Sequence, residues 1–186
     1  MKSAQDIANF FLSHSYGGEM DDLTNLKLQK LLYYTQGYSL ALLDRPIFDD
    51  LILAWRHGPV VETVWRSYNQ YGRTPLPALQ NYSLSNFEQD EIIVLNKVAS
   101  DYGHFSPWQL RDMTHEEEPW LSTPRDLYID RSLIKNYFMK KLRRPRVNTK
   151  PTFDINVEAI QSSIDSGRVD VPKLNNPKDF VKWLKR

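Results

Sequence analysis

Hydrophobic residues recur every three or four positions along most of the chain, a spacing typical of amphipathic helices. The clearest pattern begins near Thr24 or Asn25, and its expected buried stripe consists of Leu28, Leu31, Leu32, Thr35 and Leu42. Leucines and tyrosines also flank this stripe, at Leu26, Tyr33, Tyr34, Tyr38 and Leu40. A helix that is hydrophobic on more than one side should lie at the centre of the core.

Capping residues predict where several other helices begin. Serine side chains can accept a hydrogen bond from the first helical turn, and an acidic residue or glutamine three positions later completes the box. Such starts are expected at Ser3 with Asp6, Ser85 with Glu88, and Ser106 with Pro107 and Gln109. Thr114 with Glu117 predicts a further short turn, and a last core helix should run from about Asp130.

The region between the second and third expected helices is the part most suited to β-structure. Residues 47–55 contain β-friendly side chains and predict one short strand. The following Gly58-Pro59 pair predicts the start of another helix, because proline suits the first helical turn. We therefore expect a mainly α, compact multi-helix domain with at most a small β element.

The composition changes near the C-terminus and predicts three parts. Residues 1–142 form the main domain, the basic, proline-containing stretch 143–150 is a linker, and residues 151–186 form a short helical C-terminal extension. Phe180, Trp183 and Leu184 fall on one amphipathic turn of that extension. This turn suits either anchoring in a partner's groove or packing back on its own domain.

Composition indicates an ordinary globular protein that works in the cytoplasm. The chain has 186 residues, a net charge of +1 and no cysteine, so disulfides and thiolate metal sites are excluded. No signal peptide or membrane-spanning run is evident, and we expect no membrane partner. The basic run around Arg143, Arg144 and Arg146 could contact nucleic-acid phosphates, but a solvated linker is the favoured interpretation.

A search for catalytic and metal-binding motifs finds none with assignable roles. The sequence contains no HExxH, GxGxxG, GxSxG or phosphate-binding loop, and only 7 glycines. The stretch 115–118 (HEEE) could ligate a divalent metal, although acidic residues are also favoured at a helix N-terminus. We expect no catalytic residue, metal or cofactor.

Three sequence blocks, taken together, resemble a known family. They are residues 23–37 (LTNLKLQKLLYYTQG), 54–61 (AWRHGPVV) and 110–120 (LRDMTHEEEPW). In this order and spacing they are similar to the Panacea domain, also described as SocA-like or GepA-like. The resemblance covers about the first three quarters of the chain.

This resemblance implies an antitoxin, often carried on prophages, that neutralises a toxin encoded by a neighbouring gene through direct binding. One family member instead acts as an adaptor that delivers its toxin to the AAA+ protease ClpXP. Both mechanisms remain open for this chain, as does a nucleic-acid-binding regulator.

The residues of the second and third blocks allow two physical interpretations. Trp55, His57, Gly58 and Pro59, with His115, Glu117 and Trp120, could fasten a turn in the core. Alternatively, the two blocks meet and form a partner-binding surface. We list these seven residues, with Phe180, Trp183 and Leu184, as candidate partner-binding residues.

Overall fold

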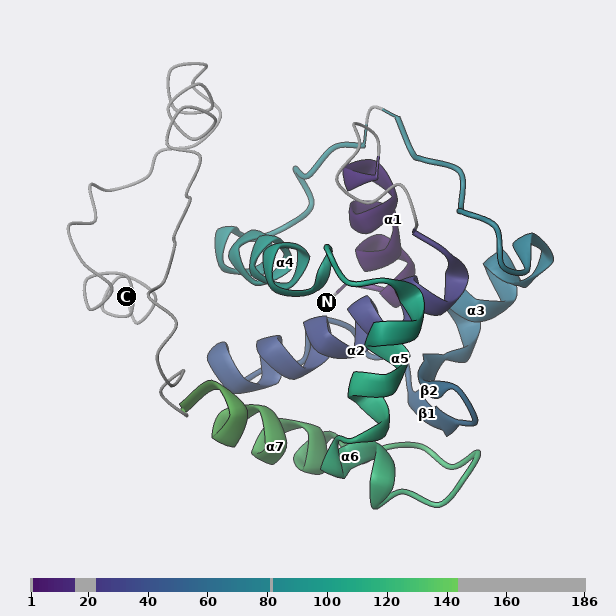
Figure 1. Ribbon diagram of the computed structural model, residues 1–186. Coiled ribbons are helices and arrows are strands. Elements are labelled where there is room, and N and C mark those ends of the chain that lie inside the picture. The colour runs from purple at the N-terminus through teal and green to yellow at the C-terminus, as the bar shows by residue number, and fades with distance from the viewer. Residues whose placement is uncertain (1, 16–22, 81, 144–186) are drawn as a thin grey trace. The chain divides into compact units, whose positions relative to one another are not determined.

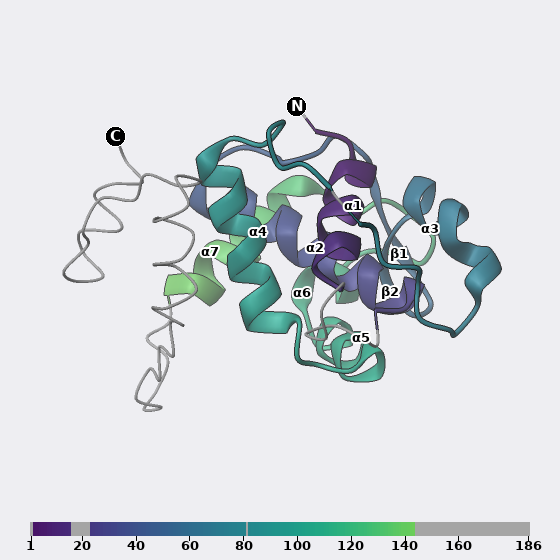
Figure 2. The ribbon, with the colours of Figure 1, turned by 90° about the horizontal axis from the view of Figure 1, so that it is seen from above.

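The computed structural model describes residues 2–15, 23–80 and 82–143, which fold around one central helix (Figures 1 and 2). The elements, in chain order, are α1 (Ala4–His14), α2 (Asn25–Leu42), β1 (Ile52–Trp55), β2 (Gly58–Val61), α3 (Glu62–Tyr68), a 3-10 helix η1 (Asn69–Tyr71), α4 (Gln89–Tyr102), α5 (Pro107–His115), α6 (Glu118–Leu121) and α7 (Arg131–Arg143). Helix α2 packs against α1, α3, α4, α5, α7 and β2. The mainly α class with a small β element is confirmed, while the predicted extension at 151–186 lies outside the described residues.

Helix α2 is buried along nearly its whole length, as its hydrophobic pattern predicted. Leu28, Leu31 and Leu32 are fully enclosed, but Leu42, expected in the same stripe, is 45% exposed in the last turn. Because neighbours cover the helix on every side, its polar residues are buried as well. These buried polar residues are Asn25, Lys27, Gln29, Lys30, Thr35, Gln36 and Ser39.

Several helix starts follow the predicted caps, and two differ. The boxes at Ser3 and Ser106 are present, and Thr24 caps α2. The prediction at Ser85 is wrong: α4 starts after Glu88, whose backbone N–H donates to Glu91 Oε2 at 3.0 Å. Helix α6 likewise starts after Glu117 and not at Thr114, whose hydroxyl donates to a carbonyl of α5. In α4 a glutamate therefore takes the place of the expected serine cap, whereas Glu117 makes no side-chain capping bond at the start of α6.

The largest correction concerns residues 47–61. The strand expected over 47–55 is confined to β1, and the helix expected at Gly58-Pro59 is instead strand β2, which pairs antiparallel with β1. Gly58 has a φ of +94°, which suits glycine at the tight turn that joins the two strands. Helix α3 begins only at Glu62, after the hairpin has ended.

A third segment extends the hairpin on the other edge of β1. The Ala54 N–H donates to the Leu127 carbonyl at 2.8 Å, and the Ile129 N–H donates to the Ile52 carbonyl at 2.7 Å. This antiparallel pairing brings the chain from α6 past the hairpin to the start of α7. Segments far apart in sequence therefore lie side by side at the hairpin.

Helix α7 is the predicted last core helix, and its contact with α2 requires a glycine. A Cβ atom on Gly37 would lie only 2.3 Å from Phe138 Cδ2. The Phe138 ring is fully buried and meets Tyr33 and Tyr38 edge-on. Gly37 thus lets the two helices approach closely.

Candidate functional site

The second and third sequence blocks lie against each other. The Trp120 indole Nε1 donates to the Trp55 carbonyl oxygen at 3.0 Å. The His115 ring stacks on the Trp120 ring, with centroids 4.0 Å apart and planes inclined by 9°. On the other side, the Trp55 ring meets Trp65 of α3 edge-on at 5.1 Å. The hairpin is therefore joined to α5 and α6 by stacked rings and one indole hydrogen bond.

At the hairpin turn, two residues of the second block face inward and a third faces solvent. Gly58 and Pro59 are buried, and the Lys30 ammonium donates to the Pro59 carbonyl at 2.9 Å. A Cβ on Gly58 would lie 2.7 Å from Thr114 Oγ1 and 2.9 Å from Lys30 Nζ. His57 is exposed, and its ring lies 6.2 Å from the Trp108 ring.

Buried amides on α2 hold the backbone of the hairpin and of the loop before it, a role that the sequence analysis missed. The Val61 N–H donates to Gln29 Oε1 at 2.9 Å. Gln36 makes a double contact, donating to the Phe48 carbonyl at 2.9 Å and accepting from the Ile47 N–H at 3.0 Å. The available signal was polar side chains inside a helix that is hydrophobic on several sides, since buried polar groups need hydrogen-bond partners.

Glu117 lies inside the protein, where it pairs with α7. Its Oε1 accepts from Lys141 Nζ at 2.6 Å and from the Tyr34 hydroxyl at 3.3 Å. Burial, and then the Glu117 charge, raise the pKa of Tyr34 well above its usual range. Burial is the largest single influence and lowers the pKa of Lys141, but the Glu117 carboxylate together with Tyr102 and Tyr137 outweighs it, so this pKa is raised overall. The Glu117 carboxylate thus connects α6 with α2 and α7.

Positive charge is concentrated around the hairpin turn. Burial, and then the nearby Arg111, lower the pKa of Lys30 to about 7. Partial desolvation beside α5, and then the charges of Arg56 and Arg111, lower the pKa of His57. The pKa of His115 is lowered by burial, then by Arg111 and Lys30. Arg111 and Lys30 act on both histidines, which places an electropositive corner between the hairpin turn and α5.

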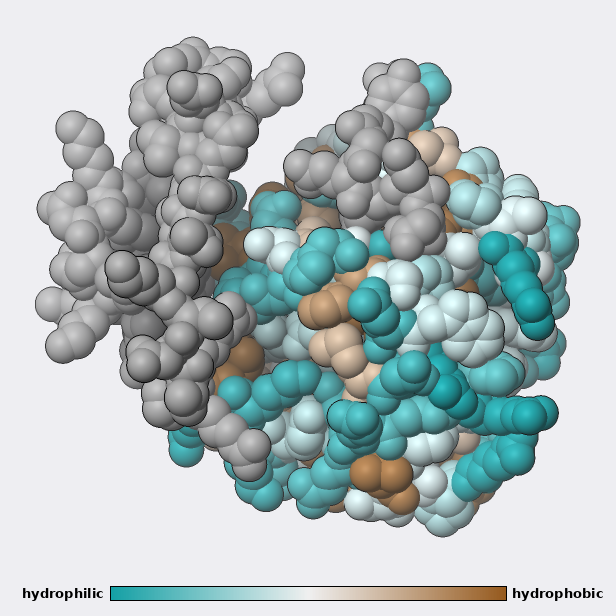
Figure 3. Space-filling view, in the orientation of Figure 1, coloured by the Kyte–Doolittle hydropathy of each residue, from teal (hydrophilic) through white to brown (hydrophobic). Residues whose placement is uncertain are grey.

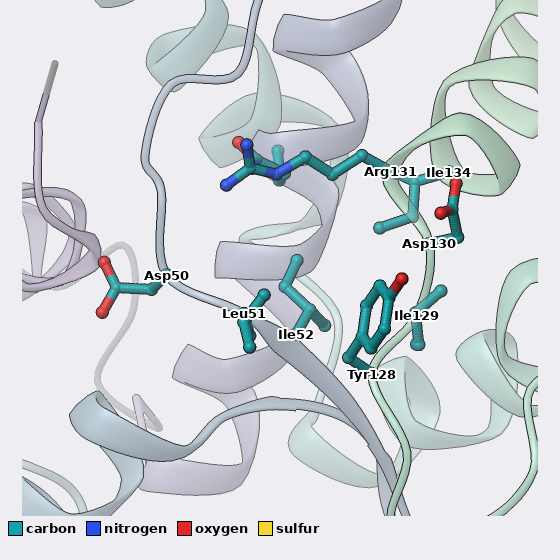
Figure 4. A pocket seen from close by; sticks show the side chains of 9 residues that line it. Asp50, Leu51, Ile52, Tyr128, Ile129, Asp130, Arg131 and Ile134 are labelled. Atoms are coloured by element: carbon teal, nitrogen blue, oxygen red, sulfur yellow. The ribbon is translucent and has the colours of Figure 1, made fainter.

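A cavity of about 350 Å³ opens between the start of β1 and the segment leading into α7 (Figure 4). Leu51 and Ile52 line it on one side, and Tyr128 and Ile129 lie opposite them, as Figure 4 shows. Leu51 is 60% exposed and Tyr128 is 55% exposed. The cavity is open to solvent and its lining is mixed, because Gln36, Asp50, Asp130 and Arg131 line it together with these hydrophobic side chains.

Most of the exposed large hydrophobic side chains lie in segments next to the hairpin. The described residues include six large hydrophobic side chains that are exposed, and five of them belong to the hairpin or to elements that pack against it. We call these five the hairpin surface: Leu51, Trp108, Leu121, Leu127 and Tyr128. Hydrophilic residues cover most of the face in Figure 3, with hydrophobic ones in small separate groups. None of these five residues stands out in the sequence as a site residue, because their exposure depends on tertiary packing.

Two candidate groups remain, namely the possible metal ligands at 115–118 and the hydrophobic turn near the C-terminus. The stretch 115–118 does not form a cluster, because His115 stacks on Trp120 while Glu117 is buried against Lys141. Within residues 2–15, 23–80 and 82–143, no group of three or more His, Asp or Glu side chains is placed to hold a metal ion. Phe180, Trp183 and Leu184 lie outside the described residues, and their role stays a prediction.

The site is therefore a hairpin whose backbone α2 and residues 127–129 hold by hydrogen bonds, with exposed hydrophobic side chains in the segments next to it. None of the helices in the described part combines the length and hydrophobicity that crossing a membrane requires. The model of the family "Antitoxin SocA-like, Panacea domain" matches residues 28–121, just over half of the chain. The chain belongs to this family, as the three blocks indicated.

One curated relative supports the same assignment. Antitoxin SocA of Caulobacter vibrioides (strain NA1000 / CB15N) is 35% identical over 69 residues, which covers 37% of this chain and 36% of the relative. The similarity thus spans about a third of that relative's length. No solved structure matched the chain.

Proposed function

We propose that this protein is a cytoplasmic antitoxin that neutralises its cognate toxin, the product of a neighbouring gene, by direct binding. Membership of the SocA-like antitoxin family supports the antitoxin role and favours a non-catalytic protein. The structural observation that carries direct binding is the hairpin surface.

The hairpin surface has the properties of a binding site. Five large hydrophobic side chains are exposed in segments around one hairpin, and exposed hydrophobic area can mark an interaction site, where tryptophan is enriched among the residues that dominate binding. Trp108 is 51% exposed and Leu127 is 56% exposed, so both have hydrophobic area left to bury. The backbone beneath them is fixed by α2 and by the pairing of β1 with residues 127–129. A preorganised surface of this kind loses little conformational freedom on binding.

Co-expression with the neighbouring gene tests this proposal. Wild-type protein should restore growth and co-purify with the toxin, whereas Trp108→Ala and Leu127→Glu should weaken both. Leu42→Glu is the matched control, because Leu42 is also exposed but lies at the far end of α2 from the hairpin. Failure of the wild type to bind the toxin or to restore growth overturns the proposal.

The same experiment separates direct neutralisation from delivery to a protease. If the protein works by binding alone, rescue persists in a host that lacks ClpXP and the amount of toxin stays unchanged. Rescue that disappears in that host, with the toxin then accumulating, identifies an adaptor instead.

A further inference from the structure

Two buried nitrogen atoms on α5 have no hydrogen-bond partner among the described residues. They are Arg111 Nε and His115 Nε2. Trp108, Arg111 and His115 are three or four residues apart, so they lie along one face of α5. That face meets the hairpin turn, since the Trp108 ring lies beside His57 and Thr114 lies beside Gly58. Buried polar atoms normally have a partner, so these two nitrogens mark hydrogen-bonding capacity that the described residues leave unused, while the Arg111 side chain as a whole is still 32% exposed.

The charged residues around these two nitrogens indicate which kind of group could bind beside them. Arg56 and His57 are exposed on the turn, and the buried Lys30 donates to a carbonyl oxygen and not to a carboxylate. Arg111 does have one acidic neighbour, because its guanidinium donates to Asp112 Oδ1 at 2.5 Å. Asp112 is largely exposed and leaves Arg111 Nε without a partner. The corner therefore keeps unused hydrogen-bond donors beside the positive charges of Arg56 and Arg111.

We propose that Arg56, His57, Arg111 and His115 bind a carboxylate side chain of the toxin, with Trp108 packing on hydrophobic atoms beside it. This inference rests on the proposed function and names the chemistry of the partner's surface. Arginine suits the task because its fork of N–H donors matches a carboxylate, and arginine and tryptophan are enriched among the residues that dominate interfaces.

The surroundings favour a protein carboxylate over nucleic-acid phosphates. A phosphate backbone requires a continuous row of cations, whereas here the positive charges form one corner. Two exposed carboxylates, Asp112 and Asp126, also lie next to arginines of this region. Leu121 and Trp108 add exposed hydrophobic area that a protein partner can cover.

Calorimetric titration of the full chain with the neighbouring gene product tests this inference. The variants are Arg56→Gln, Arg111→Gln and the double substitution, with Arg66→Gln as control because Arg66 is exposed on α3 and pairs within its own helix. We expect the double variant to bind about tenfold more weakly or worse, as loss of charge-assisted hydrogen bonds predicts. Arg56→Glu, at an exposed position, provides a second variant should the Arg111 substitution disturb folding.

Substitutions in the toxin provide the comparison that identifies the bound carboxylate. Acidic residues of the toxin are changed singly to the corresponding amides, and one of them should weaken binding to the wild type but not to the double variant. Equal affinity of the wild type and all arginine variants overturns the inference and leaves the proposed function intact. No complex with the wild type overturns both. Binding of a single-stranded oligonucleotide that is lost in the double variant, with toxin affinity unchanged, identifies a phosphate site and also overturns the inference.

Discussion

The side chain of Lys30 extends from α2 to the hairpin and is fully buried. Its ammonium donates to the Pro59 carbonyl. Burial and the nearby Arg111 oppose its charge and lower its pKa to about 7. Loss of the proton therefore removes a buried charge, and the neutral amine can still donate to the Pro59 carbonyl.

The lowered pKa of Lys30 predicts a pH-dependent stability. The unfolded chain keeps this proton up to about pH 10.5, whereas the folded protein releases it near pH 7. The unfolded state therefore binds more protons within that window, and the free energy of unfolding rises with pH there, by up to about 1.4 kcal/mol per pH unit. Urea unfolding between about pH 7 and pH 9 should show this slope in the wild type and not in Lys30→Met. Lys140→Met, at an exposed position, is the control, and equal slopes in the wild type and Lys30→Met would contradict the prediction.

Adding a side chain at Gly37 should cause a steric clash at the contact between α2 and α7. In Gly37→Ala the new methyl group would overlap the Phe138 ring, so we expect a loss of about 1–3 kcal/mol in the free energy of unfolding. Phe138→Leu in the same chain should recover part of that loss, because the smaller side chain makes room. Chemical denaturation of the four proteins measures both effects, and additive losses in the double variant would argue against a direct clash.

At the level of elements, local sequence signals predict helix starts correctly where a few neighbouring residues determine the structure. The boxes at Ser3 and Ser106 satisfy their own helix ends, so they needed no tertiary information. Strand β2 was missed because Gly58-Pro59 also suits a helix start. What selects the strand is its pairing with β1 and its contacts with Gln29 and Lys30 of α2, which lie about thirty residues earlier in the chain.

Gln36 is predicted to stabilise the loop that precedes β1. Gln36→Ala leaves the Phe48 carbonyl and the Ile47 N–H without their partner, at a cost of about 1–3 kcal/mol for a buried unsatisfied group. Hydrogen exchange at the Ile47 amide should accelerate more than exchange at helix α4. The control is Gln70→Ala in η1, where the side chain is exposed. Unchanged exchange at Ile47 would show that the loop is held by other contacts.

For the whole molecule, the sequence blocks located the right region but not the roles of their residues. Gly58, Pro59 and Glu117 face inward and support the fold, while His57 lies on the surface. The exposed residues Trp108, Leu127 and Tyr128 carry no distinctive motif, since their exposure is decided by how α5, α6 and the hairpin pack. The candidate surface therefore became visible only in the folded structure.

The C-terminal residues provide a separate test at this scale. We propose that 151–186, through Phe180, Trp183 and Leu184, adds to toxin binding beyond the hairpin surface. A chain ending at residue 150 should then stay folded but bind the toxin about tenfold more weakly, consistent with the loss of hydrophobic anchors. Circular dichroism and calorimetry measure the two properties, and full affinity of a stable truncated protein would contradict this contribution.

The most direct test of the central claim is hydrogen exchange of the protein alone and in complex with the product of its neighbouring gene. Direct binding through the hairpin surface predicts slower amide exchange in the complex around Leu51, the turn at 56–57, the start of α5 and residues 125–129. The exposed end of α2 at Leu42 should be unaffected. A complex that protects only other parts of the chain, or no complex at all, would contradict the account.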